Sequence, residues 1–165
     1  MYRLTYGYLM GICYRYVGSK EEAEEMLNIG FLKILNNLEK YRPEVPFKAW
    51  IRKVMINVLI DEYRKEKRHS EHIKYVDEYN ESGDLTEVND AMTKMNVEQI
   101  HVLIMKLPPV SRKVFNLYVI DGYMHKEIGA MLNISEGTSK WHLNFSRGKL
   151  KEMIQSLVSP IKVVA

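Results

Sequence analysis

Side chains that could contact nucleic acid recur at regular spacing in residues 135–150. A helix that begins after Ser135 would turn one set inward, because its members follow at intervals of four, three and four residues: Ser139, Leu143, Ser146 and Leu150. The outward face would then hold Glu136, Gly137, Lys140, Trp141 and Asn144. A cation, an aromatic ring and an amide near a helix N-terminus suit the reading of base edges in a major groove. Thr138 and the first backbone amides suit a phosphate.

The residues before this helix predict the element that would position it. A short helix is expected around 126–132, with Ile128 and Leu132 on its packing side, Gly129 where the two helices approach closely, and Ile134 in the turn. Two short helices joined by a tight turn form the helix-turn-helix pattern. The same pattern occurs in purely structural bundles, in which Trp141 would pack on a neighbouring helix.

A second group of aromatic, basic and amide residues lies in the first half of the chain: Tyr41, Phe47, Trp50, Arg52, Lys53, Asn57, Arg64, Lys65, Lys67 and Arg68. Interleaved rings and cations suit single-stranded nucleic acid, because rings stack on exposed bases while cations follow the phosphates. The alternative is that Trp50 is a core residue and that the basic run 64–68 is a solvated helix end.

The usual motifs of an enzyme are missing from the sequence, which has no HExxH, CxxC, GxSxG or phosphate-binding glycine loop. His69 and His72 are three residues apart but lack further ligands nearby, and a zinc site needs three or four, so we expect no metal and no cofactor. Cys13, the single cysteine, lies in an apolar stretch and is expected to pack rather than react. One unpaired cysteine and no long apolar run favour a cytoplasmic protein that is not inserted in a membrane.

The remaining elements are expected to be helices. Ser19 is a predicted N-cap, followed by an apolar stripe with helical spacing: Ala23, Met26, Leu27, Phe31, Ile34, Leu35 and Leu38. Two prolines interrupt residues 41–46, and a long helix is expected over 47–68. In the second half, a helix from about Val97 ends at Pro108-Pro109, and Ser111 is expected to cap the next. No segment alternates with the period of a strand.

Charge divides the chain into three segments. Residues 1–69 carry 13 Lys and Arg against 9 Asp and Glu, residues 70–96 carry 2 against 7, and residues 97–165 carry 9 against 5. The acidic segment also contains the turn-forming run Asn80-Glu81-Ser82-Gly83-Asp84. The predicted architecture is therefore all-α, with small helical domains at 1–69 and 97–165 joined by a flexible acidic linker at 70–96.

Both halves resemble one family, the extracytoplasmic-function (ECF) group of the sigma-70 family. The C-terminal half resembles its region 4 in Leu107-Pro108-Pro109, Arg112, Val114-Phe115, Gly122-Tyr123, Glu127-Ile128-Gly129, the run 132–138 and Arg147. The N-terminal half resembles its region 2 in the runs 16–19, 22–25, 46–51 and 61–64, with Phe31 and Asn57. The resemblance covers most of residues 6–155.

The resemblance implies a transcription factor that is not itself an enzyme and whose partners are core RNA polymerase, promoter DNA and an anti-sigma factor. Region 2 would bind the β′ coiled coil through Glu24, Glu25, Asn28 and Phe31. It would melt and read the −10 element through Tyr41, Arg42, Phe47, Trp50, Arg52, Lys53, Asn57 and Arg64. Region 4 would contact the β flap and read the −35 element through Glu136, Gly137, Thr138, Lys140, Trp141, Asn144 and Arg147.

Three positions depart from the family pattern. Ile29 stands where the family often has glutamate, Phe145 where arginine is common, and Gly148 where a basic residue is common. The alternative function is a stand-alone helix-turn-helix regulator whose N-terminal domain senses a ligand or dimerises. Such a domain has no need of an exposed surface that combines Trp50, Asn57 and a basic helix end.

Overall fold

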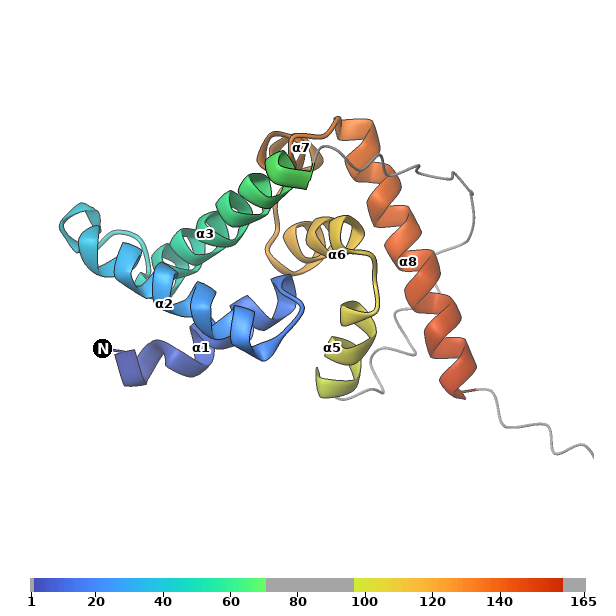
Figure 1. Ribbon diagram of the computed structural model, residues 1–165, viewed down its shortest axis with the longest axis horizontal. Helices are drawn as coiled ribbons and strands as arrows, with labels where there is room; N and C mark the ends of the chain where they lie inside the picture. Colours follow the sequence, from blue (N-terminus) through green and yellow to red (C-terminus); the bar gives the residue numbers. More distant parts are fainter. Residues whose placement is uncertain (1, 71–96, 159–165) are drawn as a thin grey trace, which may run out of the picture. The chain divides into compact units, whose positions relative to one another are not determined.

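The computed structural model describes residues 2–70 and 97–158, and within these ranges every regular element is a helix (Figure 1). The chain divides into two compact units, residues 1–75 and 76–165. The all-α prediction is confirmed. Apart from Ser70, the predicted linker at 70–96 lies outside the described residues, so its limits and character stay a prediction.

The N-terminal unit is formed by α1 (Tyr2–Tyr16), α2 (Lys20–Asn36) and α3 (Phe47–Ser70), and each of the three packs against the other two. As predicted, Ser19 is the N-cap of α2: its Oγ accepts a hydrogen bond from the backbone N–H of Glu22 at 3.1 Å. Gly30 lies where α2 meets α3, and a Cβ there would collide with the side chain of Met55. The core of this unit comprises Leu9, Ile12, Cys13, Tyr16, Ala23, Met26, Leu27, Ile34, Ile51, Met55, Ile56, Val58, Leu59 and Ile60.

The connection between α2 and α3 follows the proline signals. A short 3₁₀ helix, η1 (Leu38–Lys40), ends α2, and residues 41–46 are non-helical. The Tyr41 hydroxyl donates a hydrogen bond to the carbonyl oxygen of Val45 at 2.9 Å, which closes this loop against itself. The predicted apolar stripe of α2 holds through Ile34 but is wrong at Leu35 and at Leu38 of η1, which are 42% and 38% exposed because no described element covers them.

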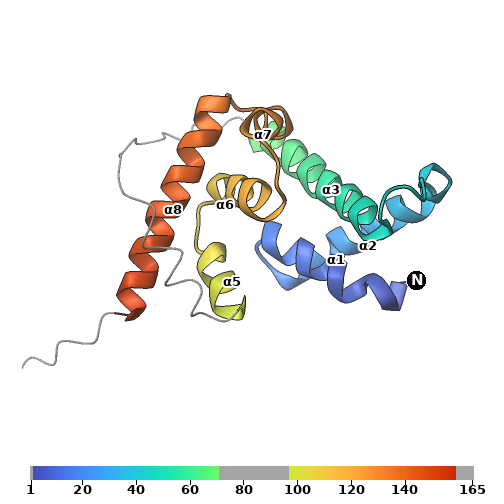
Figure 2. The ribbon, with the colours of Figure 1, turned by 180° about the vertical axis from the view of Figure 1, so that it is seen from behind.

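The C-terminal unit contains α5 (Val97–Met105), α6 (Pro109–Phe115), the π-helical η2 (Asn116–Ile120), α7 (His125–Leu132) and α8 (Glu136–Val158). The long α8 packs against α5, α6 and α7 (Figure 2). The core of the unit comprises Leu103, Ile104, Leu107, Val114, Phe115, Leu117, Ile128, Leu132, Leu143, Leu150 and Ile154.

Ser111 does not cap α6, which corrects the expectation from the sequence. The helix begins two residues earlier at Pro109, where a fixed φ favours the first helical turn, and Pro108 takes the N-cap position. Ser111 is buried instead. Its hydroxyl is hydrogen-bonded to Nδ1 of His142 at 2.9 Å, and its carbonyl oxygen accepts a hydrogen bond from Ser146 at 3.1 Å. Its role is therefore to join α6 to α8.

Candidate nucleic-acid interface

The two faces of α8 lie as the sequence predicted. Ser139, Leu143, Ser146 and Leu150 are each at most 3% exposed, so they form the inward face. On the other side, Glu136, Gly137, Lys140 and Asn144 are exposed, and Thr138, Trp141 and Arg147 are half-buried. All the residues proposed from the sequence to contact the −35 element are therefore accessible at the surface of the unit.

The turn between α7 and α8 is set by three local features. Asn133 adopts a left-handed conformation with φ 54°, which ends α7. A Cβ at Gly129 would lie 2.8 Å from the carbonyl oxygen of Ile134, so only glycine allows this close approach. Ser135 caps α8 by accepting a hydrogen bond from the backbone N–H of Thr138 at 2.9 Å. The helix-turn-helix is thus held by backbone geometry as well as by apolar packing.

A cluster that the sequence reasoning missed braces α8 against η2 and α7. The His125 ring stacks on Tyr118 with centroids 4.4 Å apart, and its Nδ1 is hydrogen-bonded to Oγ of Ser139 at 2.9 Å. The Arg147 guanidinium lies over the Tyr118 ring, 6.0 Å from its centroid. Partial burial lowers the pKa of His125, as do the cations Lys140 and Arg147, whereas Glu136 opposes the shift.

In the N-terminal unit, the predicted aromatic residues come together where α3 begins. The ring centroids of Tyr41 and Phe47 are 5.3 Å apart, those of Tyr41 and Trp50 are 5.3 Å apart, and those of Phe47 and Trp50 are 5.9 Å apart. All three rings are half-buried. Trp50 is therefore neither a core residue nor fully exposed, and the cluster offers ring surface beside the loop at 41–46.

An open hollow of about 180 Å³ adjoins this cluster, lined by Lys33, Asn37, Lys40, Trp50, Val54 and Asn57. Trp50 and Asn57 were predicted site residues; the lining from α2 and η1 was not predicted. Of the other residues proposed for the −10 element, Arg42 and Lys53 are exposed, and Arg52 and Arg64 are half-buried. Two amides, two lysines and an indole around one hollow match the polar edge, phosphates and ring face of a nucleotide.

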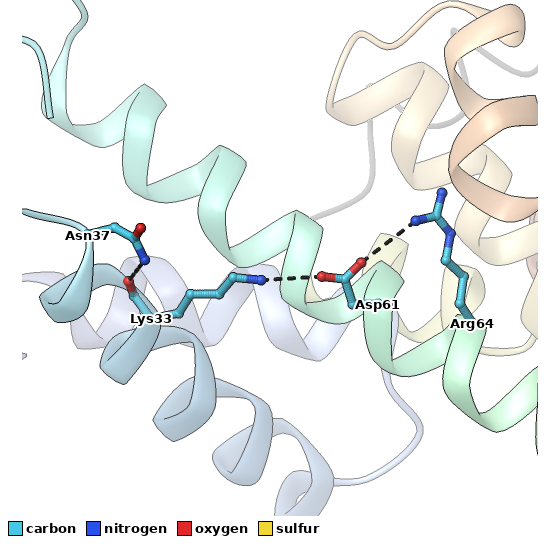
Figure 3. A network of polar contacts seen from close by, with 4 residues as sticks. All are labelled: Lys33, Asn37, Asp61 and Arg64. Carbon is cyan, nitrogen blue, oxygen red and sulfur yellow. Dashed lines mark hydrogen bonds and ion pairs between the residues drawn. The ribbon is translucent and has the colours of Figure 1, made fainter. Parts of the chain in front are cut away.

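Asp61 joins two cations beside this hollow (Figure 3). Its carboxylate lies 3.3 Å from Nζ of Lys33 on α2 and 3.7 Å from a guanidinium nitrogen of Arg64 on α3. The carbonyl oxygen of Lys33 in turn accepts a hydrogen bond from the Asn37 amide at 2.7 Å. Two residues that line the hollow, Lys33 and Asn37, therefore belong to one network that Asp61 ties to α3.

The proposed polymerase-binding residues lie on α2. Glu24, Glu25 and Asn28 are exposed, whereas Phe31 is half-buried against Tyr2, whose ring meets it edge-on at 4.7 Å. Three exposed aliphatic side chains share α2 with them: Ile29 at 42%, Leu32 at 58% and Leu35 at 42%. These apolar residues were not part of the prediction, and periodicity alone assigned Leu35 to the core.

Cys13 is fully buried, as expected, and burial raises the pKa of its thiol to about 12. No described helix has both the length and the apolar character needed to cross a membrane. Within the described residues, no three His, Cys, Asp or Glu side chains gather as a metal site would require; His72 lies outside those residues.

Comparison with known proteins places both units in one family. The family description "Sigma-70 region 2" matches residues 1–69, and "Sigma-70, region 4" matches residues 97–150. The ECF RNA polymerase sigma factor SigW of Bacillus subtilis is 29% identical over 156 residues, which span 88% of this chain and 82% of SigW. RNA polymerase sigma factor SigZ of the same organism is 30% identical over 139 residues, 84% of this chain and 76% of SigZ.

The fold is also that of a solved sigma factor. RpoE of Bartonella quintana, solved in complex with the anti-sigma factor NepR, superposes with a TM-score of 0.55 at 14% identity and covers 96% of both chains. Both sigma regions occur in order along the chain, and SigZ is 30% identical to it over the 139 aligned residues. The chain therefore belongs to the sigma-70 family of RNA polymerase sigma factors, in its extracytoplasmic-function group.

Proposed function

We propose that this sigma factor opens the −10 element with the hollow and aromatic cluster of its N-terminal unit and reads the −35 element with α8. The observation that carries the proposal is the hollow between Trp50 and Asn57, bordered by Lys33 and Lys40. A surface of this kind serves an unpaired base and its phosphates rather than an intact duplex.

The energetics of melting favour this assignment. Extruding a base from a duplex costs a few kcal/mol, and stacking on an aromatic side chain returns about 1–3 kcal/mol per base. The cluster of Tyr41, Phe47 and Trp50 therefore offsets much of that cost once a base leaves the stack. Asn57 would hydrogen-bond to its polar edge, while Arg42, Arg52, Lys53 and Arg64 attract the backbone.

At the −35 element, α8 would enter the major groove with its outward face toward the bases. Gly137, Trp141 and Asn144 would meet base edges, and Lys140, Arg147 and the amide of Thr138 would meet phosphates. Glu136 would accept a hydrogen bond from a cytosine amino group. The C-terminal unit would also contact the β flap of the polymerase.

Core polymerase would bind the outward face of α2. Glu24, Glu25 and Asn28 supply the polar contacts of this surface, and Ile29, Leu32 and Leu35 add apolar area that would be buried by the β′ coiled coil. The polymerase supplies the chemistry of RNA synthesis, so this chain contributes recognition and melting and is not itself an enzyme. It would act in the cytoplasm, where polymerase and chromosome are found.

An anti-sigma factor is the proposed inhibitor of this chain. The supporting observation is that RpoE of Bartonella quintana, which shares the fold, was solved with an anti-sigma factor bound. A protein of this class would compete with polymerase or promoter for one of the surfaces described above.

Affinity for core polymerase tests the proposal through the α2 surface. Leu32→Arg should weaken binding of the chain to purified core polymerase strongly, because it introduces a charge into a buried contact. Leu4→Arg is the matched control, since Leu4 lies on α1 outside the proposed polymerase surface and is 89% exposed compared with 58% for Leu32. Equal binding by both variants would remove α2 from the polymerase interface, and no binding by the wild-type chain would contradict sigma function.

A further inference from the structure

A strip without charged side chains runs along the middle of the outward face of α8. Gly137, Trp141, Asn144 and Gly148 follow at intervals of four, three and four residues, so they lie one above another on the helix, and Phe145 adjoins them. This strip lies opposite the buried residues Ser139, Leu143, Ser146 and Leu150. It is therefore the part of α8 that would lie deepest in a groove.

The aromatic residues of the strip form one continuous apolar surface. Trp141 and Phe145 are stacked, with ring centroids 5.3 Å apart and planes inclined by 20°. Trp141 also meets the His142 ring edge-on at 4.8 Å. Both rings of the stack are half-buried, so they keep an exposed side. Since each ring restrains the other, contact with a ligand costs little conformational entropy.

Gly137 leaves room beside this surface. A Cβ at Gly137 would meet only Oγ of Ser135, at an ordinary 3.7 Å, so packing within the chain does not require glycine there. Gly137 is the second residue of α8 and is exposed, so a bound molecule can approach the helix backbone closely there.

The neighbouring lysines flank the strip instead of occupying it. Nζ of Lys140 lies 2.7 Å from the carboxylate of Glu136, and Nζ of Lys149 lies 2.9 Å from that of Glu152. Exposed ion pairs of this kind are weak, so either lysine is able to turn to a phosphate. Arg147 also lies beside the strip, with its guanidinium 6.0 Å from the centroid of the Tyr118 ring, so the strip itself carries no long cation of the kind that reads guanine bidentately.

We infer that α8 recognises A·T base pairs in the −35 element, with Trp141 and Phe145 contacting thymine methyl groups and Asn144 hydrogen-bonding to an adjacent adenine. The thymine C5 methyl is the apolar group that distinguishes bases in the major groove, and adenine N6 and N7 match a carboxamide. The inference rests on the proposed function, because it takes α8 to be the helix in the groove. It adds which base pairs that helix prefers.

The test uses holoenzyme assembled from core polymerase and the full chain, with a promoter library randomised over both elements. Promoters recovered from transcripts are expected to carry thymine at a fixed −35 position. Each recovered promoter is then rebuilt with deoxyuridine at that position, which removes the methyl group and preserves base pairing. Loss of one buried methyl contact should lower holoenzyme affinity about fourfold.

Variants assign this methyl effect to the aromatic pair. Phe145→Ala and Trp141→Ala should bind the thymine and deoxyuridine promoters equally, and thermal unfolding identifies a variant that fails to fold. Holoenzyme with Asn144→Ala should still bind the thymine promoter about fourfold more tightly than the deoxyuridine promoter. It should lose the preference for adenine at the adjacent position. Gln155→Ala, an exposed position near the far end of α8, is the control that should retain both preferences.

The failures of the two proposals are distinguishable. A holoenzyme that initiates at library promoters without any thymine preference, or equally well on deoxyuridine, would overturn methyl recognition and leave sigma function intact. Methyl dependence that survives in both aromatic variants would also overturn it. A holoenzyme that initiates at no promoter of the library would overturn the proposed function and this inference with it.

Discussion

Gly129 shows how a single residue controls the geometry of the promoter-reading helix. The carbonyl oxygen of Ile134, which an added Cβ would meet at 2.8 Å, belongs to backbone that is itself tied down: the Ile134 N–H donates to the carbonyl oxygen of Gly129 at 3.0 Å. A side chain at 129 therefore cannot be accommodated by rotating a neighbour, and the turn between α7 and α8 must shift.

Gly129→Ala should destabilise the C-terminal unit by about 1–3 kcal/mol, the usual range for overpacking. Gly11→Ala is the matched control: Gly11 lies inside α1, and an added Cβ meets nothing within 4 Å. That variant should gain about 0.5–1 kcal/mol, because alanine restricts the unfolded chain and favours a helix. Chemical denaturation of both variants measures the difference, and a Gly129→Ala variant as stable as wild type would contradict the described turn.

His125 predicts a pH dependence of stability. Its pKa is lowered from 6.5 in the folded protein, so folding favours the neutral ring over the protonated one. Its contribution to stability is therefore complete above pH 6.5 and is lost as the pH falls through the lowered value. Glu136, which faces the ring together with Lys140 and Arg147, titrates at lower pH because its own pKa is lowered from 4.5.

Acidification from about pH 7.5 to about pH 5.5 passes through the ordinary histidine pKa of 6.5, below which the unfolded chain takes up a proton at this position. His125→Gln keeps a hydrogen-bonding group for Ser139 but cannot titrate, so its melting temperature should fall less than that of wild type over this interval. His69→Gln, at an exposed position on α3, should behave as wild type. If the melting temperatures of wild type and His125→Gln fall equally with pH, protonation of the His125 ring is not coupled to folding.

At the scale of elements, Asp61 connects α2 to α3 beside the hollow. It holds Lys33 at 3.3 Å and Arg64 at 3.7 Å, and all three side chains are 41–58% exposed. Exposed pairs contribute little to stability. We therefore expect the network to matter more for the placement of the cations than for the free energy of unfolding.

Asp61→Asn should reduce the preference of holoenzyme for the −10 strand over an unrelated single strand by about two- to fivefold, the loss expected for surface pairs. Glu66→Gln removes the same charge from an exposed position on α3 and is the control. Both variants should bind the unrelated strand somewhat more tightly, since both carry one negative charge fewer. Fluorescence anisotropy measures both affinities; equal discrimination by the two variants would leave Asp61 without a positioning role.

Elements were predictable from sequence where the signal was local. The caps at Ser19 and Ser135, the interruption at 41–46 and the inward face of α8 each depend on neighbouring residues, and each is found. The lining of the hollow by Lys33, Asn37 and Lys40 could not be predicted, because it depends on how α2 and η1 lie against α3.

Other errors have the same origin. Helical periodicity extends to Leu35, but whether a stripe is covered depends on where the partner helix lies, and Leu35 is exposed. Tyr118, which stacks on His125, lies in the wide turn of η2, where the Asp121 N–H donates to the carbonyl oxygen of Asn116 at 2.9 Å. No pattern in the sequence marks a π-helical turn.

For the whole molecule, the distribution of charge limits what the chain does alone. Each half has four more cationic than anionic residues, 13 against 9 in residues 1–69 and 9 against 5 in residues 97–165, and the segment between them is acidic. So few excess cations allow only a small number of phosphate contacts, and the electrostatic part of the affinity grows with that number. Specific binding to duplex promoters is therefore expected only when polymerase holds the protein.

Promoter-directed initiation by reconstituted polymerase tests this account most directly. Core polymerase, the full chain and a promoter library randomised at the −35 and −10 elements are combined, and transcripts are counted with and without the chain. The account predicts transcripts from a defined subset of promoters only when the chain is present, while the chain alone binds those duplexes weakly at moderate salt. Tight, sequence-specific duplex binding by the chain alone, with no gain in initiation on adding it to core polymerase, would contradict sigma function and favour a stand-alone helix-turn-helix regulator.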